Sequence, residues 1–170
     1  MKIALCGFLG SGCTEIAEIL AAKFGLETLN TSRIITSIEN LEPLSRSGEI
    51  FFDKIIKERL DEILKREDNI IVEGRSAFLL LDREDVIKIF LNASFEDRAK
   101  HVAERRGISL EEAKEDVERS DEDRRSLLKR FLRKESVDAS LFDFTINTSS
   151  KSYSKIADIL AEAIKSISEG

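Results

Sequence analysis

The sequence predicts a three-layer α/β sandwich, in which a five-stranded parallel sheet carries helices on both faces. Three observations predict this class. Short apolar runs alternate with segments of helical periodicity along the 170 residues, a rhythm typical of parallel sheets. Two of the runs, 70–72 and 86–91, are nearly continuous in apolar character, as strands buried on both faces are. The first run leads into a glycine-rich turn and then a helical pattern, the order that phosphate-binding turns require.

The strands and the main helices follow from local patterns. The segments with strand character are 2–6, 27–30, 69–73, 86–91 and 142–147. Apolar residues recur at three- and four-residue intervals over 52–64 and over 156–167, so we expect an amphipathic helix in each of these segments. Residues 42–47 read as a loop, and the chain shows no internal repeat or interdomain linker. We therefore expect one domain over residues 1–170.

Helix ends are also marked in the sequence. Ser94 is expected to begin a helix after the fourth strand, and Gly107 is expected to end it. Ser109 and Glu112 form the S-x-x-E pattern of a capping box, in which each residue binds the backbone N–H of the other. A second helix should therefore start directly after Ser109.

Residues 7–14 read Gly-Phe-Leu-Gly-Ser-Gly-Cys-Thr and are called the glycine loop below. Glycines allow successive backbone N–H groups to point into one concavity, and the following helix dipole adds positive charge there. The hydroxyl of Thr14 is placed to ligate Mg²⁺, whereas Cys13 stands where a lysine usually reaches the β- and γ-phosphates. The residues expected to bind phosphate are Gly7, Leu9, Gly10, Ser11, Gly12, Cys13 and Thr14. The alternative is a structural glycine turn that binds no nucleotide.

Cys13 itself has two interpretations. It is a passive small residue, or it is a redox-sensitive thiol whose pKa is lowered by the helix N-terminus. Neither Cys13 nor Cys6 fits a disulfide framework or a zinc-binding spacing.

Composition excludes several classes of protein. The net charge of −6 argues against a broad nucleic-acid surface. No apolar stretch approaches the roughly 18–20 residues that cross a bilayer, and the first residues do not form a signal peptide. With 42% hydrophobic and 35% charged residues, the composition is that of an ordinary globular protein, which we expect in the cytoplasm.

Arginines follow the predicted sheet at two places. Gly74 and Arg75 end the third strand beside the glycine loop, at the sheet edge where open α/β folds bind ligands. The segment 108–143 is rich in arginine and is expected to form a mobile, solvated pair of helices over the same edge. The alternatives are an ordinary ion pair for Arg75 and a solvated helix face for the charged segment.

Taken together, these motifs resemble those of nucleoside monophosphate kinases, most closely the archaeal type of cytidylate kinase. The resemblance covers the whole chain and is most specific at residues 10–14, 72–75, 88–91 and 105–113, with further support at 117–119 and 146–149. It implies the fold of P-loop NTPases with an arginine-rich helical lid. It also implies that ATP binds the glycine loop with Mg²⁺ and that a nucleoside monophosphate, CMP or dCMP, accepts the γ-phosphoryl group.

The resemblance assigns regions and residues. Residues 31–68 would form the acceptor-binding helical region, and residues 105–140 would form the lid. The implied catalytic residues are Arg75, Arg119 and Arg124, the implied acceptor-binding residues are Arg33, Arg59, Gly74 and Arg75, and Thr14 would hold Mg²⁺. We expect a monomer whose partners are its nucleotide substrates, without nucleic acid or membrane.

The chain also departs from this family. The acceptor-site arginine expected after the second strand falls on Thr36, and Arg33 lies one helical turn earlier. Residues 127–131 replace a tyrosine-rich part of the lid. We hypothesise that a lid arginine supplies the charge of the missing lysine. The alternatives are a kinase of another nucleotide or small metabolite, and a nucleotide-binding protein without turnover.

Overall fold

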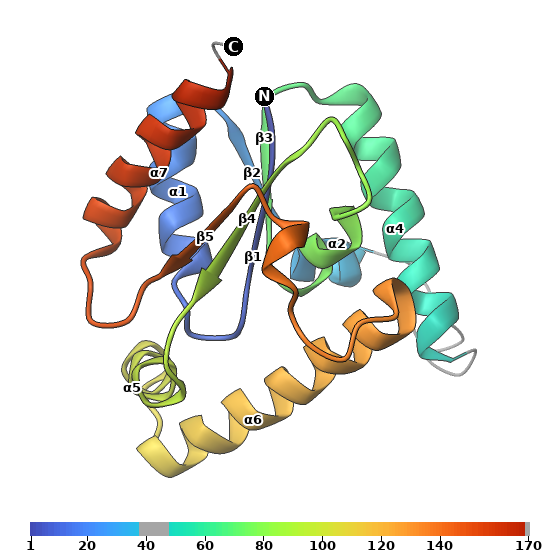
Figure 1. Ribbon diagram of the computed structural model, residues 1–170. Coiled ribbons are helices and arrows are strands. Elements are labelled where there is room, and N and C mark those ends of the chain that lie inside the picture. Colours follow the sequence, from blue (N-terminus) through green and yellow to red (C-terminus); the bar gives the residue numbers. More distant parts are fainter. Residues whose placement is uncertain (38–47, 169–170) are drawn as a thin grey trace.

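The structure is a computed structural model that describes residues 1–37 and 48–168, so the loop expected at 42–47 lies outside the described residues. Five strands form one parallel sheet in the order β2-β3-β1-β4-β5 (Figure 1). The strands are β1 (Lys2–Gly7), β2 (Glu27–Asn30), β3 (Ile70–Glu73), β4 (Ile87–Asn92) and β5 (Phe144–Asn147). The predicted α/β class with a five-stranded parallel sheet is confirmed.

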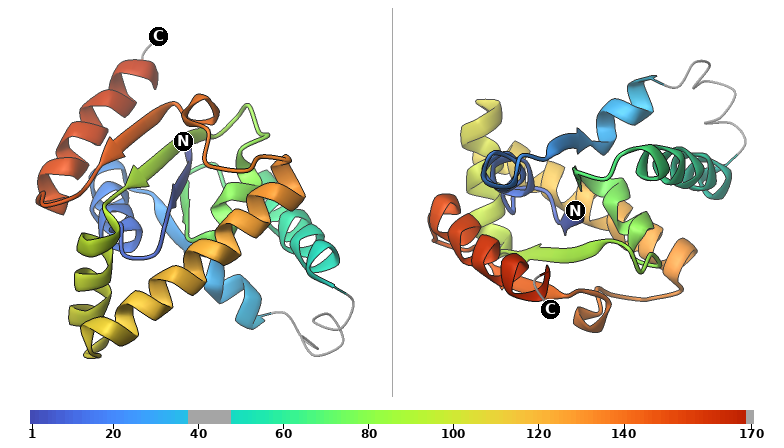
Figure 2. Two further views of the ribbon diagram at one scale, coloured as in Figure 1. Left: turned by 60° about the horizontal axis from the view of Figure 1, so that its bottom comes forward. Right: turned by 90° about the horizontal axis from the view of Figure 1, so that it is seen from above.

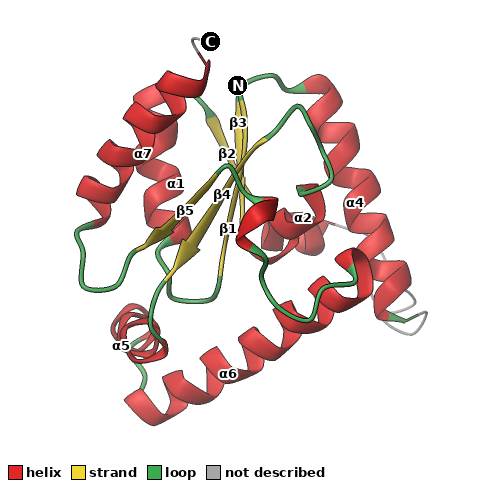
Figure 3. Cartoon of the chain, viewed as in Figure 1, coloured by secondary structure: helices red, strands yellow, loops and turns green. Residues whose placement is uncertain are grey.

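Helices cover both faces of the sheet (Figure 3). One face carries α1 (Cys13–Phe24) and α7 (Tyr153–Ser168). The other carries α2 (Thr31–Ser37), α4 (Glu49–Arg66) and the 3₁₀-helix η1 (Arg75–Leu80). The helices expected at 52–64 and 156–167 are confirmed within α4 and α7. Two further helices, α5 (Phe95–Arg106) and α6 (Leu110–Leu127), lie beyond the carboxyl ends of the strands (Figure 1).

The core has one part on each face of the sheet, because successive strand residues point to opposite faces. The part beneath α1 and α7 includes Ile3, Leu5, Ile16, Leu20 and Leu160. The part beneath α4 and η1 includes Ala4, Cys6, Leu60, Phe78 and Phe90.

The strand register brings polar residues together at one edge of the sheet. Leu5 of β1 pairs with Glu73 of β3, and Asn30 of β2 pairs with the same residue. Gly7, the last residue of β1, pairs with Leu91 of β4. Since all strands are parallel, the ends of β1, β2 and β3 open onto a common carboxyl edge, where α/β folds bind ligands.

The last strand starts two residues later than the sequence predicts. The 3₁₀-helix η3 (Ala139–Leu141) precedes it, and Phe142 packs on the sheet instead of extending the strand. Its ring centroid lies 5.1 Å from that of Phe90 and 6.4 Å from that of Phe78. A phenylalanine in an aromatic cluster and one in a strand have the same sequence signature.

The predicted caps of α5 and α6 are confirmed. Ser94 Oγ accepts a hydrogen bond from the backbone N–H of Asp97 at 3.2 Å. Gly107 ends α5 in the left-handed conformation, with φ of 65°. At α6, Ser109 Oγ accepts from the Glu112 N–H at 3.2 Å, and a Glu112 carboxylate oxygen accepts from the Ser109 N–H at 2.9 Å.

The expected solvated pair of helices over 108–143 is corrected by the structure. A single long helix, α6, crosses in front of the carboxyl ends of the strands in the left view of Figure 2 and continues into a π-helical turn, η2 (Leu128–Leu132). Ala113 and Val117 are buried against α5, and Leu127 and Leu128 enter the core of the sheet. Small residues supplied the buried stripe that the sequence pattern did not reveal.

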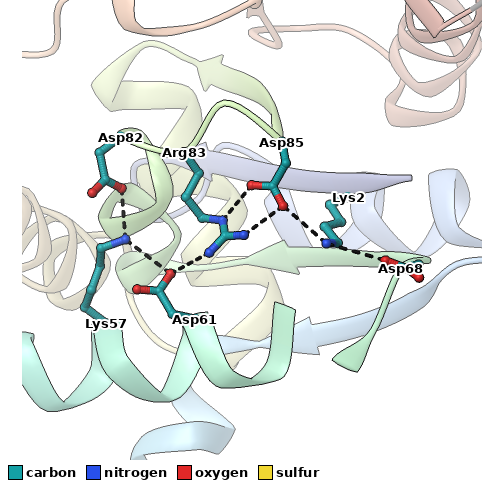
Figure 4. Close-up of polar contacts among 7 residues, drawn as sticks. All are labelled: Lys2, Lys57, Asp61, Asp68, Asp82, Arg83 and Asp85. Carbon is teal, nitrogen blue, oxygen red and sulfur yellow. Dashed lines mark hydrogen bonds and ion pairs between the residues drawn. The ribbon is translucent and has the colours of Figure 1, made fainter. Parts of the chain in front are cut away.

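The amino end of the sheet carries a chain of ion pairs, called the amino-edge network below (Figure 4). Its members are Lys2, Lys57, Asp61, Asp68, Asp82, Arg83 and Asp85. Arg83 donates to both carboxylate oxygens of Asp85, at 2.8 and 2.7 Å, and to Asp61 at 2.8 Å. The network thereby joins β1, α4 and the connection between η1 and β4.

None of the helices formed by the described residues combines the length and apolar character needed to cross a membrane.

Candidate active site

The glycine loop lies between the end of β1 and the start of α1. Gly10 and Gly12 adopt left-handed conformations, with φ of 86° and 90°. A Cβ at Gly10 would lie 2.5 Å from the carbonyl oxygen of Arg98, and one at Gly12 would lie 2.6 Å from the ring of Tyr153. Both conformation and space therefore require glycine at these two positions.

Hydrogen bonds within and around the loop fix its shape. The backbone N–H and the hydroxyl of Ser11 both donate to the carbonyl oxygen of Phe8, at 3.1 and 2.7 Å. The hydroxyl of Thr148, which follows β5, donates to the carbonyl oxygen of Ser11 at 2.9 Å. Because Ser11 and Thr148 are both buried, these bonds are shielded from water. The loop is held in a fixed conformation at the N-terminus of α1, where the helix dipole favours an anion.

A cavity of about 320 Å³, called the loop cavity below, opens in front of this loop. Its wall comes from the glycine loop, the ends of β2 and β3, α5 and α6. The lining residues are Gly7, Phe8, Leu9, Gly10, Gly12, Cys13, Thr14, Asn30, Thr31, Ser32, Glu73, Gly74, Arg75, Arg105, Arg106 and Arg124. All predicted loop residues except Ser11, whose side chain is turned inward to Phe8, thus face the cavity.

Four arginines contribute to the cavity wall from three directions. Arg75 follows β3, Arg105 and Arg106 form the last turn of α5, and Arg124 comes from α6. Arg106 is oriented by Asp116 of α6, whose carboxylate accepts from Nη1 at 2.6 Å. Several guanidinium groups around a glycine-rich loop and a helix N-terminus form a site for a multiply charged anion.

Arg124 makes the most direct contact with the glycine loop. Its Nε donates to the carbonyl oxygen of Gly7 at 2.9 Å, and its Nη1 donates to the hydroxyl of Ser120. Burial lowers the pKa of Arg124 below its ordinary value, but an arginine remains protonated at neutral pH. A partly buried cation therefore lies beside the loop that lacks a lysine.

Cys13 is not a reactive thiol. Burial raises its pKa to about 12, and the hydroxyl of Ser11 lies 3.6 Å from its sulfur. The thiolate is the form that reacts with oxidants and electrophiles. The alternative of a thiol with a lowered pKa is therefore contradicted, because burial is the largest influence on the pKa of Cys13 and raises it. Cys6 and Cys13 are both free cysteines.

Thr14 and Glu73 place two oxygen-bearing side chains that can ligate a metal ion on the cavity wall. The Thr14 hydroxyl donates to a carboxylate oxygen of Glu73 at 3.4 Å, and the side-chain amide of Asn30 donates to the same oxygen. Burial raises the pKa of the Glu73 carboxyl. Mg²⁺ prefers such oxygen ligands and is usually held by one or two protein groups together with substrate phosphates and water. The donor set therefore fits a magnesium–nucleotide complex.

Arg75 is shared between two carboxylates. Its Nη1 donates to Asp53 of α4 at 3.4 Å, and its Nε and Nη2 donate to the two oxygens of Asp123 of α6. Asp53 is 3% exposed and also accepts from Arg130 Nη2 at 2.8 Å, whereas the side chain of Asp123 is 44% exposed. Asp53 is thus the buried partner of two arginines, and Asp123 is the exposed partner of Arg75 that a ligand can displace.

The structure brings some of the predicted arginines together and not others. Arg75 and Arg124 line the loop cavity, while Arg33, Arg59 and Arg119 are not among the described residues of its wall. Arg59 pairs with Glu62 of its own helix, and its side chain is 55% exposed. The side chain of Arg119 is 77% exposed and lies 3.6 Å from Asp116 of its own helix. The roles implied for Arg33, Arg59 and Arg119 stay predictions that this arrangement does not support.

The sequence analysis assigned no role in the candidate site to Arg105, Arg106 or Asp53. Two arginines in the last turn of a helix are also what the helix dipole favours, so Arg105 and Arg106 carried no separate signal. Asp53 occupies a polar position in an amphipathic pattern, where a solvated carboxylate is the common outcome. One available signal was the glycine directly after Arg106, since it ends α5 at the sheet edge that binds ligands.

Known proteins are similar in sequence to this chain over most of its length. Residues 45–150 match the Cytidylate kinase-like family. The chain is 31% identical to the cytidylate kinase of Pyrococcus horikoshii over 174 residues, which span 96% of this chain and 88% of that protein. It is 33% identical to the cytidylate kinase of Sulfurisphaera tokodaii over 171 residues, which span 94% and 93% of the two chains.

Solved structures share the fold at lower identity. An uncharacterised protein from Eubacterium ventriosum superimposes with a TM-score of 0.75 at 19% identity, covering 98% of this chain and 99% of that one. A shikimate kinase from Acinetobacter baumannii superimposes with a TM-score of 0.62 at 18% identity, covering 95% and 91% of the two chains. At such identities the likeness is one of fold alone.

Proposed function

Because the chain belongs to the cytidylate kinase-like family, we propose that it transfers the γ-phosphoryl group of ATP to CMP or dCMP. The products are ADP and CDP or dCDP. In this step the bond between the γ-phosphorus and its bridging oxygen breaks, and a phosphate oxygen of the acceptor forms the new bond. The chain is a phosphotransferase of this family, and the choice of acceptor is the part that requires a test.

The observation that carries the proposal is the ring of four arginines around the glycine loop. Phosphoryl transfer asks the protein for positioning and for neutralisation of charge on the transferring group, with little covalent chemistry. Loop N–H groups and the N-terminus of α1 are suited to the donor phosphates. The arginines are suited to the charge shared between donor and acceptor.

Arg124 is the residue we assign to the role of the missing lysine. It is partly buried, it is anchored on the Gly7 carbonyl oxygen, and it shares the cavity wall with Cys13. Thr14 and Glu73 would hold the Mg²⁺ that accompanies ATP, and the ion would supply further neutralisation of the phosphates. Arg105 and Arg106 add two more positive charges to the cavity wall from the last turn of α5.

The acceptor phosphate would bind at Arg75. This residue follows β3 at the carboxyl edge, and it lines the loop cavity. Asp53 fixes one edge of its guanidinium, so the edge now facing Asp123 is the one a phosphate would take. The acceptor region at 31–68, the lid at 105–140, ATP as donor and a monomeric state in the cytoplasm belong to the same proposal.

An assay of ADP release with ATP, Mg²⁺ and a panel of monophosphates tests the proposal. We expect turnover with CMP and dCMP and at least about tenfold lower kcat/KM with AMP, GMP, UMP and shikimate, because a site that hydrogen-bonds one substrate rejects analogues that leave its polar groups unpaired. Turnover with another acceptor would change the substrate and keep the reaction. ATP binding without any turnover would show a nucleotide-binding protein instead.

A further inference from the structure

A buried ion pair outside the cavity wall joins α5 to α6. Arg98 donates from Nη1 and Nη2 to the two carboxylate oxygens of Asp121, at 2.8 Å each. Arg98 is 5% exposed and Asp121 is 8% exposed. A bidentate pair of this kind fixes both the separation and the orientation of the groups that carry it.

The same guanidinium also contacts the backbone of the glycine loop. Its Nη1 donates to the carbonyl oxygen of Leu9 at 3.3 Å, and its Nε donates to that of Ala93 at 3.2 Å. It lies over the ring of Phe8, 5.4 Å from the ring centroid. The backbone of Arg98 also lies against the glycine loop, since a Cβ on Gly10 would lie 2.5 Å from the Arg98 carbonyl oxygen. Arg98 thus connects the glycine loop, the turn after β4 and α6.

Asp121 lies three residues before Arg124, so the two side chains share one face of α6. Asp121 is held by Arg98, and Arg124 in turn reaches the Gly7 carbonyl oxygen at 2.9 Å. We propose that Arg98 and Asp121 are positioning residues that hold Arg124 against the glycine loop for phosphoryl transfer. This inference rests on the proposed function for its kinetic part and on the fold alone for its structural part.

Another ion pair between the same two helices provides a matched comparison. Lys114 of α6 lies 3.7 Å from Glu96 of α5, where the carboxylate side chain is 61% exposed. Neither residue lines the loop cavity or bonds to the glycine loop in the part of the chain that the structure describes. A variant at Glu96 therefore removes an interhelical charge pair while leaving the link to the loop in place.

The test requires that both buried charges be removed together. Breaking half of a buried pair leaves an uncompensated charge and destabilises the fold, whereas replacing both partners by apolar residues is often tolerated. We therefore choose Arg98→Met with Asp121→Leu as the pair variant. Arg98→Lys is the second variant, because it keeps the positive charge beside Asp121 and loses the two-pronged grip.

The kinetic experiment is a double-variant cycle with CMP as acceptor. A displacement of about 1 Å at a catalytic group lowers the rate by roughly 100-fold, so we expect this fall in kcat for the pair variant. Loss of a stabilising hydrogen-bond donor typically lowers kcat by about 100- to 1000-fold, and we expect a fall of this size for Arg124→Met alone. Because the pair acts through Arg124, adding the pair substitutions to Arg124→Met should lower kcat by no more than about threefold further.

Controls separate this role from a general loss of structure. Glu96→Gln should stay within about twofold of the wild-type kcat, since exposed pairs contribute little. Arg98→Lys should lower kcat by at least about tenfold, because an ammonium group cannot make the bidentate contact of a guanidinium group. The melting temperature of this variant should fall less than that of a variant with a core substitution. Multiplicative effects of the pair and Arg124 substitutions, or a wild-type kcat in a folded Arg98→Lys variant, would overturn the inference.

Hydrogen exchange gives a readout that needs no catalysis. In the nucleotide-free protein, the amides of residues 120–127 should exchange at least about tenfold faster in the pair variant, with α7 unchanged, because local opening follows local contacts. Arg98→Lys should show the same pattern more weakly, and Glu96→Gln should not. If the wild type turns over no monophosphate, the proposed function fails. Unchanged exchange over 120–127 in both Arg98 variants would instead reject the positioning role.

Discussion

At position 13 of the glycine loop, a partly buried thiol occupies the place of an ammonium, and another element supplies a positive charge to the cavity. Arg124 approaches from α6 and lines the cavity, with its Nε bonded to the Gly7 carbonyl oxygen and its Nη1 bonded to the Ser120 hydroxyl. Burial raises the pKa of Cys13 to about 12, so the position adds no negative charge at neutral pH. A neutral small residue is therefore compatible with an arginine close to the loop.

Cys13→Lys tests whether this substitution of charges is complete. We expect kcat to rise by less than about fivefold, because Arg124 already supplies the stabilising cation. The measurement is steady-state ADP formation under saturating ATP and CMP. A gain of about 100-fold or more would mean that nothing in the cavity compensates for the absent lysine.

The ion pairs of Arg75 give a second prediction at this scale. Asp123 holds Nε and Nη2 of Arg75 from an exposed position, so an acceptor phosphate must displace this carboxylate before it binds. Asp123→Asn should therefore lower the KM for the acceptor by about two- to fivefold, the range equivalent to an exposed ion pair. Glu122→Gln is the matched control, because Glu122 lies next to it on α6 and pairs with Arg125. A higher KM for Asp123→Asn would show that Asp123 helps to bind the acceptor.

At the scale of elements, α6 is the helix on which most of the proposed chemistry depends. It carries Asp121, Asp123 and Arg124, and its ends are fixed differently. Its N-terminus has a capping box, and its C-terminus enters the sheet core through Leu127 and Leu128. A change at the cap should affect the helix without touching the loop cavity.

Ser109→Ala removes this cap. The backbone N–H of Glu112 loses its acceptor, and we expect the free energy of unfolding to fall by about 1 kcal/mol. Ser109→Thr keeps the hydroxyl and should stay within about 0.5 kcal/mol of the wild type. Urea denaturation followed by circular dichroism measures both. Equal stability of the alanine variant would mean that the start of α6 is held by its packing on α5 alone.

Elements whose signals are local were predictable from the sequence. The strands β1, β3 and β4 are apolar runs with buried residues, whereas β2 and β5 contain none. The predicted limits of all five differ from the observed ones by two residues or fewer. The caps at Ser94 and Ser109 depend on residues three positions apart. The predicted fold class needed no more than these signals and their alternating order.

The wall of the candidate site depends on contacts between distant segments, and here the sequence was less informative. Arg124 and Arg119 lie in the same charged run, yet Arg124 is partly buried and bonds to the glycine loop, whereas Arg119 is exposed. The face that α6 turns to the loop is decided by Ala113 and Val117, which pack on α5. Residues this small give a weak hydrophobic pattern, so the orientation of α6 could not be deduced.

At the scale of the whole molecule, the two edges of the sheet carry different kinds of charge. The carboxyl edge holds the four arginines of the loop cavity, in a chain whose net charge is −6. The amino edge holds the amino-edge network, in which positive and negative side chains alternate and satisfy one another (Figure 4). Function can thus be altered at one edge and stability at the other.

The amino-edge network predicts how stability depends on pH. Hydrogen bonds from Arg83 lower the pKa of Asp85 from its ordinary value of 3.8 to about 2 in the folded protein. The stabilisation from Asp85 is therefore fully present above the unfolded pKa and is lost as the pH falls toward the folded pKa.

At about pH 6, Asp85→Asn should be less stable than the wild type by roughly 0.5–1 kcal/mol, a small value because the pair is partly exposed. Thermal denaturation should show this difference shrinking below about pH 4 and vanishing near pH 2, and about 1 M NaCl should reduce it at pH 6. Asp158→Asn, which breaks the separate pair with Lys23 between α7 and α1, is the control with the same change of charge. A difference that persists unchanged to pH 2 would mean that Asp85 stabilises the fold by packing and not by its charge.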